Sequence, residues 1–286
     1  MSETQKLVGV VEAKKPDMGR AISKAKPDSD RLGSGLISAA FEGKLDKVKK
    51  LVAEGADVNS ADISGETALT FAIQKGQCEM VRFLLEAGAK DFLAIGKQSA
   101  VKIAAEWGSL SMMKTLVAAG FEVDIPDCEG MTALMAACRI CKENDGPEKV
   151  KLLISKGADV NRATYERGYT PLHYAVGFDV TQSAELLLQK GASVHIEGKN
   201  RSGDTTSSLL ETAIGNANPD MVRILVREGA MSDVSYEAWR RMVGTIMRTA
   251  AKYEYGRPAK KAAWFEIWDM IDRDHFQAMH ICNPYI

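Results

Sequence analysis

Aliphatic residues recur along residues 34–231 in short clusters that have the spacing of one helix face. Val81, Leu84 and Leu85 form one cluster, and each cluster follows a shorter segment with small residues such as Ala104 and Ala105. Apolar residues at this spacing predict amphipathic helices, and small residues let neighbouring helices approach closely. The pattern therefore predicts pairs of short helices with one buried side. The matching cluster of a later pair is Leu152, Leu153 and Ile154.

Glycines expected to end the second helix of each pair give the chain its period. They are spaced by 33, 32, 37, 34 and 38 residues, and most are followed by Ala. Glycine adopts the left-handed conformation of a helix end at little cost. A period near 33 is typical of a repeat made of two short antiparallel helices and a hairpin-like loop. These glycines are Gly55, Gly88, Gly120, Gly157, Gly191 and Gly229.

Residues with a side-chain hydroxyl stand where the first helix of each pair should begin. A hydroxyl at this position accepts a hydrogen bond from an amide of the first helical turn. In the fourth pair the cap is Thr132 and the glycine comes four residues late, which predicts an insertion within CRICKENDGPE. The other caps, each twenty-one residues before a glycine, are Ser34, Thr67, Ser99, Thr170 and Ser208.

Several units share a longer signature in the same phase. They read GETALTFAIQKGQCEMVRFLLEAGA, GMTALMAAC, SKGADVNRA, AEGADVNSA and GYTPLHYAV. This signature resembles ankyrin repeats over residues 34–231. The resemblance implies an all-α solenoid of about six helix-turn-helix repeats with hairpin-like loops. The third unit, SAVKIAAEWG, and the sixth, SLLETAIGNAN, depart from the pattern, and only Pro171 fills the helix-start position with proline.

His173 is the residue of GYTPLHYAV that raises the question of catalysis. The resemblance implies instead that its ring braces the adjoining loop by hydrogen bonding. A buried, hydrogen-bonded histidine needs no catalytic explanation, so we favour the structural role. The equivalent positions of other units hold Thr70, Lys102, Met135 and Glu211.

The two ends of the chain differ from the repeats. Residues 1–33 are rich in Lys, Asp, Ser, Pro and Gly, which predicts a flexible N-terminal tail, with a docking motif around KLVGVVEA as the alternative. Residues 232–286 predict two amphipathic helices, with Trp239, Met242 and Ile246 on the apolar face of the first. We expect this C-terminal pair to cap the open end of the array. Its interleaved basic residues suit a solvated outer face better than contact with phosphates or an acidic partner.

Composition and charge add no signal for nucleic acid or a membrane. The 286 residues carry a formal net charge of −1, and no apolar stretch approaches the roughly 20 residues that span a bilayer. The five cysteines are an odd number without disulfide-framework spacing, which favours a reducing, cytoplasmic location.

No arrangement of residues typical of an active site stands out. Cys138 and Cys141 form a lone CxxC that could clamp the inserted loop through a metal, but inert thiols are the simpler interpretation. The sequence shows no phosphate-binding loop, HExxH or nucleophile elbow. We therefore expect no catalytic residue, cofactor or metal. A second group near the C-terminus is His275, His280 and Cys282.

The resemblance implies that the first helices and loop tips line a concave surface on which side chains not needed by the stack can contact a partner. Aromatic residues at such positions are candidates because large rings dominate interface energetics. For Trp107 and Phe178 the alternative is packing on neighbouring repeats. The loop HIEGKNRSGDTTS is either tolerated slack or a further recognition element. The predicted partner-binding residues are Phe41, Trp107, Met131, Tyr165, Arg167, Tyr169 and Phe178.

Taken together, these features predict a non-enzymatic scaffold, adaptor or inhibitor that binds another protein. One alternative is a targeting arm for an enzyme or effector whose activity lies in the C-terminal segment. Another is nucleic-acid contact through the basic C-terminal helix, which the balanced charge disfavours.

Overall fold

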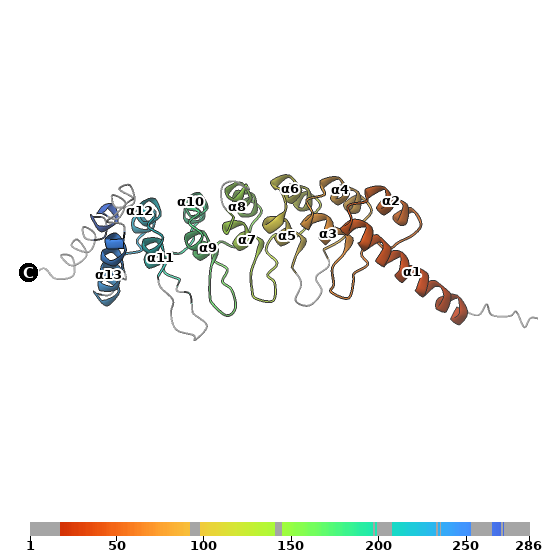
Figure 1. The fold of residues 1–286 in the computed structure, drawn as a ribbon, viewed down its shortest axis with the longest axis horizontal. Helices are drawn as coiled ribbons and strands as arrows, with labels where there is room; N and C mark the ends of the chain where they lie inside the picture. Colours follow the sequence, from red (N-terminus) through yellow and green to blue (C-terminus); the bar gives the residue numbers. More distant parts are fainter. Residues whose placement is uncertain are drawn as a thin grey trace, which may run out of the picture.

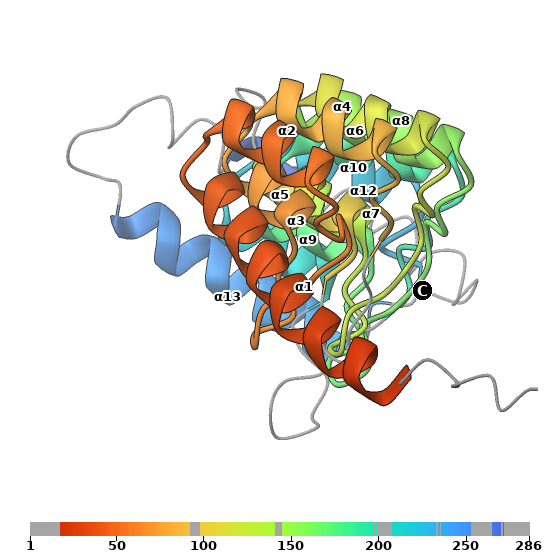
Figure 2. The same ribbon diagram turned by 90° about the vertical axis from the view of Figure 1, so that its right-hand side faces the viewer.

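The computed structural model describes residues 18–91, 98–140, 145–196, 198, 208–232, 234, 236–252, 265–269 and 271. Within these ranges the chain is helical, and its only β-pairing is an isolated bridge between Ala61 and Thr67. Paired helices stack into an elongated array with two rows (Figure 1). Viewed along the array, the helices of each row lie behind one another (Figure 2). The predicted all-α ankyrin repeat solenoid is confirmed.

We number the repeats by their helix pairs, from repeat 1 (α1 and α2) to repeat 6 (α11 and α12). The first-row helices are α1 (Met18–Phe41), α3 (Ala68–Gln74), α5 (Ala100–Trp107), α7 (Ala133–Cys138), α9 (Pro171–Gly177) and α11 (Leu209–Gly215). The second-row helices are α2 (Leu45–Ala53), α4 (Cys78–Glu86), α6 (Leu110–Ala118), α8 (Gly146–Ser155), α10 (Thr181–Gln189) and α12 (Pro219–Arg227). The helix α13 (Tyr236–Lys252) follows the last repeat.

The predicted caps account for where most first-row helices begin. Thr67, Ser99, Thr132 and Ser208 each accept a hydrogen bond from the amide three residues later, at 3.1 to 3.4 Å. Each bond satisfies a donor that the first helical turn leaves unpaired. The two units with atypical sequences, which begin at Ser99 and Ser208, are therefore ordinary members of the array.

Ser34 is the exception among the predicted caps. The helix α1 starts at Met18, and Ser34 lies inside it, with its hydroxyl donating to the Arg31 carbonyl at 3.1 Å. The prediction that helical structure begins at Ser34 and that a tail extends to residue 33 is wrong for residues 18–33. The physical reason is packing: Leu32 contacts the core, and Gly33 lies directly against Ser60 of the first loop. Residues 1–17, with KLVGVVEA, lie outside the described part of the chain.

The core runs continuously between the two rows. Small residues such as Ala104 and Ala137 are fully buried in the first row, where they allow close helix packing. Leu84 and Leu153 are fully buried in the second row, whereas Leu85 is only partly buried at its edge. Leu85, predicted on the buried face with Leu84, packs against the core only from its edge, because Leu84 faces the centre of the stack. All six repeat glycines have φ between +85° and +91°, as a left-handed helix end requires.

Aspartates organise the loop tips. Asp62 and Asp127 each accept hydrogen bonds through Oδ1 from the amides two and four residues ahead, at 2.8 to 2.9 Å. In repeat 5 the Thr164 hydroxyl has this role, because it accepts a hydrogen bond from the Tyr169 amide at 3.0 Å. A side chain that satisfies loop amides fixes the direction in which the loop leaves the stack.

Two lysines are buried in the middle of the array. Lys149 donates to the carbonyls of Ala105 and Gly108 at 3.1 and 2.7 Å, so its charge lies at the negative end of α5, and burial lowers its pKa. Lys102 places its ammonium 2.9 Å from Asp127 Oδ2, with side chains 3% and 9% exposed. Burial tends to raise the pKa of Asp127, but hydrogen bonds from Lys102 and from loop amides outweigh it and hold that pKa below its usual value.

Asparagines connect consecutive loops. Asn59 donates to the Gly88 carbonyl at 3.3 Å, and Asn161 donates to the Gly191 carbonyl at 2.9 Å. The same position before α7 is occupied by Asp124, which has no hydrogen to donate when ionised. Its Oδ1 is buried without a hydrogen-bond partner among the described residues, and burial raises its pKa. By the repeat spacing, the carbonyl that it should meet is that of Gly157.

We expect Asp124→Asn to stabilise the protein by about 1 kcal/mol, because the new amide can donate to the Gly157 carbonyl. The lost pairing with Arg162, a contact of 2.9 Å between partly exposed groups, costs little. The matched change Asn161→Asp should destabilise by a similar amount. Urea unfolding of the three proteins measures both effects, and a loss of stability in Asp124→Asn would contradict this account.

The C-terminal segment closes the array. The helix α13 packs on α11, and its residues Met242 and Ile246 join the core. Residues 265–269 are also helical, and Ile267 and Ile271 are buried against the same core. The described part of the predicted helix pair thus covers the apolar face of repeat 6, as an open solenoid needs.

Candidate functional site

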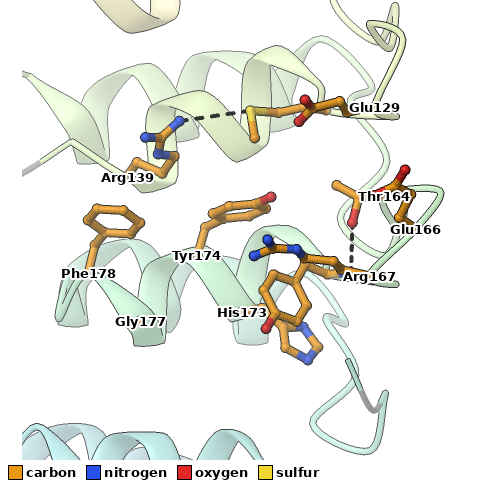
Figure 3. Close-up of a pocket in the computed structure, with 11 residues that line it drawn as sticks. Glu129, Arg139, Thr164, Glu166, Arg167, His173, Tyr174, Gly177 and Phe178 are labelled. Atoms are coloured by element: carbon orange, nitrogen blue, oxygen red, sulfur yellow. Dashed lines mark hydrogen bonds between the residues drawn. The ribbon is translucent and has the colours of Figure 1, made fainter. Parts of the chain in front are cut away.

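An open groove of about 570 Å³ lies between repeats 4 and 5. It runs from the loop tips before α7 and α9 to the far ends of these helices (Figure 3). The lining residues are Glu129, Met131, Arg139, Thr164, Glu166, Arg167, Tyr169, His173, Tyr174, Gly177 and Phe178. We call this hollow the α7–α9 groove.

Aromatic rings form one wall of the groove. The Tyr169 ring stacks on His173 with centroids 5.2 Å apart and an angle of 8°, and it meets Tyr174 edge-on at 6.1 Å. Such contacts fix ring orientation and add to the stabilisation from burial. The wall is therefore preformed rather than assembled when something binds.

His173 holds this wall to the backbone. The Thr170 amide donates to His173 Nδ1 at 3.1 Å, so Nδ1 is unprotonated. Burial lowers the pKa of His173 to about 4, against a weaker opposing effect from a hydrogen bond to the Ile196 backbone. The ring is neutral at physiological pH and braces the start of α9 through Thr170, and its hydrogen bond to the Ile196 backbone reaches an adjoining loop, the contact that the family resemblance implied.

Two arginines lie over rings of the groove. The Arg139 guanidinium lies 5.3 Å from the centre of the Phe178 ring, and the Arg167 guanidinium lies 5.9 Å from the centre of the Tyr169 ring. Arg139 also approaches Glu106 at 3.7 Å and the Met131 sulfur at 4.0 Å. Cations held over ring faces keep their N–H edges available for other acceptors.

The structure brings together four of the seven predicted partner-binding residues. Met131, Arg167, Tyr169 and Phe178 all line the groove. Tyr165 lies beside it on the loop of repeat 5, 67% exposed, with its amide donating to the Glu129 carbonyl. These five residues form one continuous surface on two adjacent repeats.

The other two predicted residues lie elsewhere. Trp107 is 67% exposed at the end of α5, which does not fit the alternative that it packs on neighbouring repeats. Phe41, in repeat 1, contacts the Phe71 ring edge-on at 5.4 Å and carries the Lys75 ammonium over its face. Neither residue lines the α7–α9 groove.

The predicted partner-binding residues did not include Arg139, Tyr174, Glu129 or Glu166, which also line the groove. Arg139 occupies the same position at the end of its first-row helix as Gly177, but the inserted stretch CRICKENDGPE hid this equivalence. Tyr174 and Glu129 carry no pattern of their own. Their position depends on contact between repeats, which a periodicity within one repeat does not reveal.

The metal interpretation of the CxxC gains no support. Cys138 is fully buried, burial strongly raises the pKa of its thiol, and Cys141 lies outside the described residues. His275, His280 and Cys282 also lie outside the described residues, as does most of the loop between repeats 5 and 6. Across the described ranges, no cluster of His, Cys, Asp and Glu could hold a metal ion. No described helix is long and apolar enough to cross a bilayer.

Comparison with known proteins follows the same repeats. A family model for ankyrin repeats in three copies matches residues 19–94, 36–127, 101–198 and 139–237. A putative palmitoyltransferase ZDHHC13 of Danio rerio is 33% identical over 189 residues, 65% of this chain and 28% of that protein. The B-cell lymphoma 3 protein homolog of Mus musculus is 33% identical over 174 residues, 58% of this chain and 36% of that protein.

The solved structures agree. The crystal structure of the ankyrin repeat domain of Bcl-3, titled a unique member of the IkappaB protein family, aligns with a TM-score of 0.59 and 28% identity. The alignment covers 74% of this chain and 97% of the Bcl-3 domain. The chain spans about a third of the length of the two curated relatives, but nearly all of the solved repeat domain. The repeat period, the helix caps and these matches together show that the chain belongs to the ankyrin repeat family.

Proposed function

We propose that this chain is a protein-interaction scaffold that binds its partner through the α7–α9 groove and the neighbouring loop tips. The main support is the groove itself, where exposed rings and two guanidinium groups are fixed in place by contacts within the protein. A preformed surface loses little conformational entropy on binding, and rings and arginines are the side chains that contribute most at interfaces.

A binding role fits these side chains better than a catalytic one. The histidine of the groove accepts a hydrogen bond from the Thr170 amide through Nδ1 and stacks under Tyr169. A general base needs a free nitrogen aimed at the group that it deprotonates. The groove is also open to solvent, so water would have ready access to any reacting group.

Truncating the groove should abolish partner capture without unfolding the array. We expect the double change Met131→Ala and Phe178→Ala to weaken binding by about 2 kcal/mol or more, or at least thirtyfold. The measurement is affinity purification from native lysate with mass spectrometry, followed by titration of the recovered partner. Phe178 is 48% exposed and Met131 is only partly buried, so the double change should lower the melting temperature only slightly.

Phe265→Ala is the matched control, because this phenylalanine is similarly exposed but lies in the C-terminal segment. Its partner binding should equal that of the wild type. Equal capture by the groove variant and the wild type would contradict the proposed surface. Loss of capture with Phe265→Ala would point instead to the C-terminal segment.

Similarity to palmitoyltransferases supports a second candidate, a repeat arm that delivers a target to an enzyme. In that case the groove would bind the enzyme's substrate, and the active part would lie outside residues 34–231. A fragment of residues 1–231 that keeps partner binding would fit either candidate, whereas transferase activity in the full chain would favour the second. We further propose a cytoplasmic location, which the free thiols of Cys78, Cys128 and Cys138 support.

A further inference from the structure

The two arginines of the groove lie over ring faces, and only Arg139 is near a carboxylate, that of Glu106. The separation of 3.7 Å between Arg139 and Glu106 is too long for a hydrogen bond. None of the ion pairs between described residues includes Arg167, which is exposed on its loop. Both guanidinium groups therefore have N–H donors available on the groove side.

Tyr174 adds a third donor between them. Figure 3 shows its ring between Arg139 and Arg167, on the groove side of α9. Its hydroxyl makes no hydrogen bond to another described residue. Burial raises the pKa of Tyr174, the charges of Arg139 and Arg167 act in the opposite direction, and those of Glu129 and Asp127 add to the rise. A half-buried hydroxyl flanked by two guanidinium groups is suited to donate to an anion.

Negative charge lies at the other end of the groove. Glu129 and Glu166 are exposed on the loop tips before α7 and α9, away from Arg139 and Phe178 at the helix ends. The two cations and two carboxylates of the lining balance each other, and Glu106 beside Arg139 adds a further negative charge. This arrangement favours a singly charged carboxylate over a doubly charged phosphate, and it offers a site for a positive group beside the loops.

We propose that the α7–α9 groove binds an extended peptide segment of a protein partner, an inference that rests on the proposed function. Arg139, Arg167 and Tyr174 hold an acidic side chain of this segment. A basic side chain of the same segment faces Glu129 and Glu166, and an apolar side chain between them packs on Met131 and Tyr169. The helix α7 has six residues and is about 9 Å long. An extended chain covers this length in about three residues, and Glu129 lies on the loop before the helix, so acid and base should be at least three residues apart.

The first test is selection of peptides on the full chain. Peptides that bind the Met131→Ala and Phe178→Ala double variant are first removed from a random library of short peptides. Those that bind the wild type are then selected from the remainder. We expect enriched peptides to carry Asp or Glu three or more positions from Lys or Arg, with an apolar residue between them. Failure to recover any groove-dependent peptide would count against the proposed function itself. Groove-dependent peptides without an acidic residue would overturn only the carboxylate site.

The second test measures where the acid binds. Arg139→Gln with Arg167→Gln should weaken a selected peptide about tenfold to a hundredfold, and Tyr174→Phe, which keeps the ring, about threefold to tenfold. Replacing the peptide's acid by its amide should cost affinity in the wild type but nothing further in the double-arginine variant. Arg223→Gln is the control, because this exposed arginine of α12 is paired with Asp220 and should not affect binding.

A phosphorylated peptide distinguishes the two anion chemistries. With phosphoserine in place of the acidic residue, we expect weaker binding, because Glu129 and Glu166 oppose the second negative charge. Tighter binding of the phosphopeptide would overturn the commitment to a carboxylate. An unchanged affinity in the double-arginine variant would overturn the site altogether. Circular dichroism of each variant confirms that the array remains folded.

Discussion

Lys102→Met is expected to lower the free energy of unfolding by about 3–5 kcal/mol, because it leaves the Asp127 carboxylate buried without its partner. The two groups are 2.9 Å apart, and their side chains are almost fully enclosed. Asp127 also accepts hydrogen bonds from the amides of Glu129 and Met131. A carboxylate that has lost its lysine partner would therefore disturb the loop that lines the groove. Urea unfolding at neutral pH measures the loss.

Two further variants test whether the unpaired charge is the cause. Asp127→Asn added to Lys102→Met should recover much of the lost stability, because the amide oxygen still accepts the loop amides and no charge remains buried. Lys50→Met should change stability by less than about 1 kcal/mol, because Lys50 and Glu54 are exposed and 3.8 Å apart. A loss of similar size for Lys50 and Lys102 would show that burial of the pair is not decisive.

The repeat frame could be predicted because its determinants are local. A hydroxyl before a helix and a glycine after it act within one turn of the chain, so Thr67 or Gly88 carries its meaning in its immediate sequence. Ser34 stands at the same spacing before a repeat glycine as the helix caps do, yet it lies inside α1. What decides its role is Leu32 and Gly33, which pack against the core and against Ser60 of the next loop.

The groove could be predicted only in part, for a related reason. Met131, Tyr169 and Phe178 stand at positions that the repeat leaves free, so their residue type alone marks them as unusual. Arg139 belongs to repeat 4 but lies over Phe178 of repeat 5, and Tyr174 of repeat 5 lies between Arg139 and Arg167, so both gain their importance from contact between repeats. The replacement of the loop asparagine by Asp124 likewise matters only because of a carbonyl in the following repeat.

Leu153→Ala should cost about 2–5 kcal/mol, because Leu153 is fully buried in α8 and a cavity would remain in the stack. Leu85→Ala should cost less than about 2 kcal/mol, since Leu85 is only partly buried at the edge of α4. The comparison is well matched, because both residues occupy second-row helices of internal repeats. Equal losses would show that burial in the stack does not set the cost.

The position of the damage is as informative as its size. The helix α8 packs on α6, α7 and α10, and repeats in a linear array are coupled mainly to their neighbours. Hydrogen exchange of the Leu153→Ala protein should therefore accelerate in these helices and remain slow in α2 at the N-terminal end. The α7–α9 groove lies within the weakened region, so the same variant should also bind its partner less tightly. Uniform loss of protection along the chain would indicate that the array unfolds as a single unit and that local coupling does not describe it.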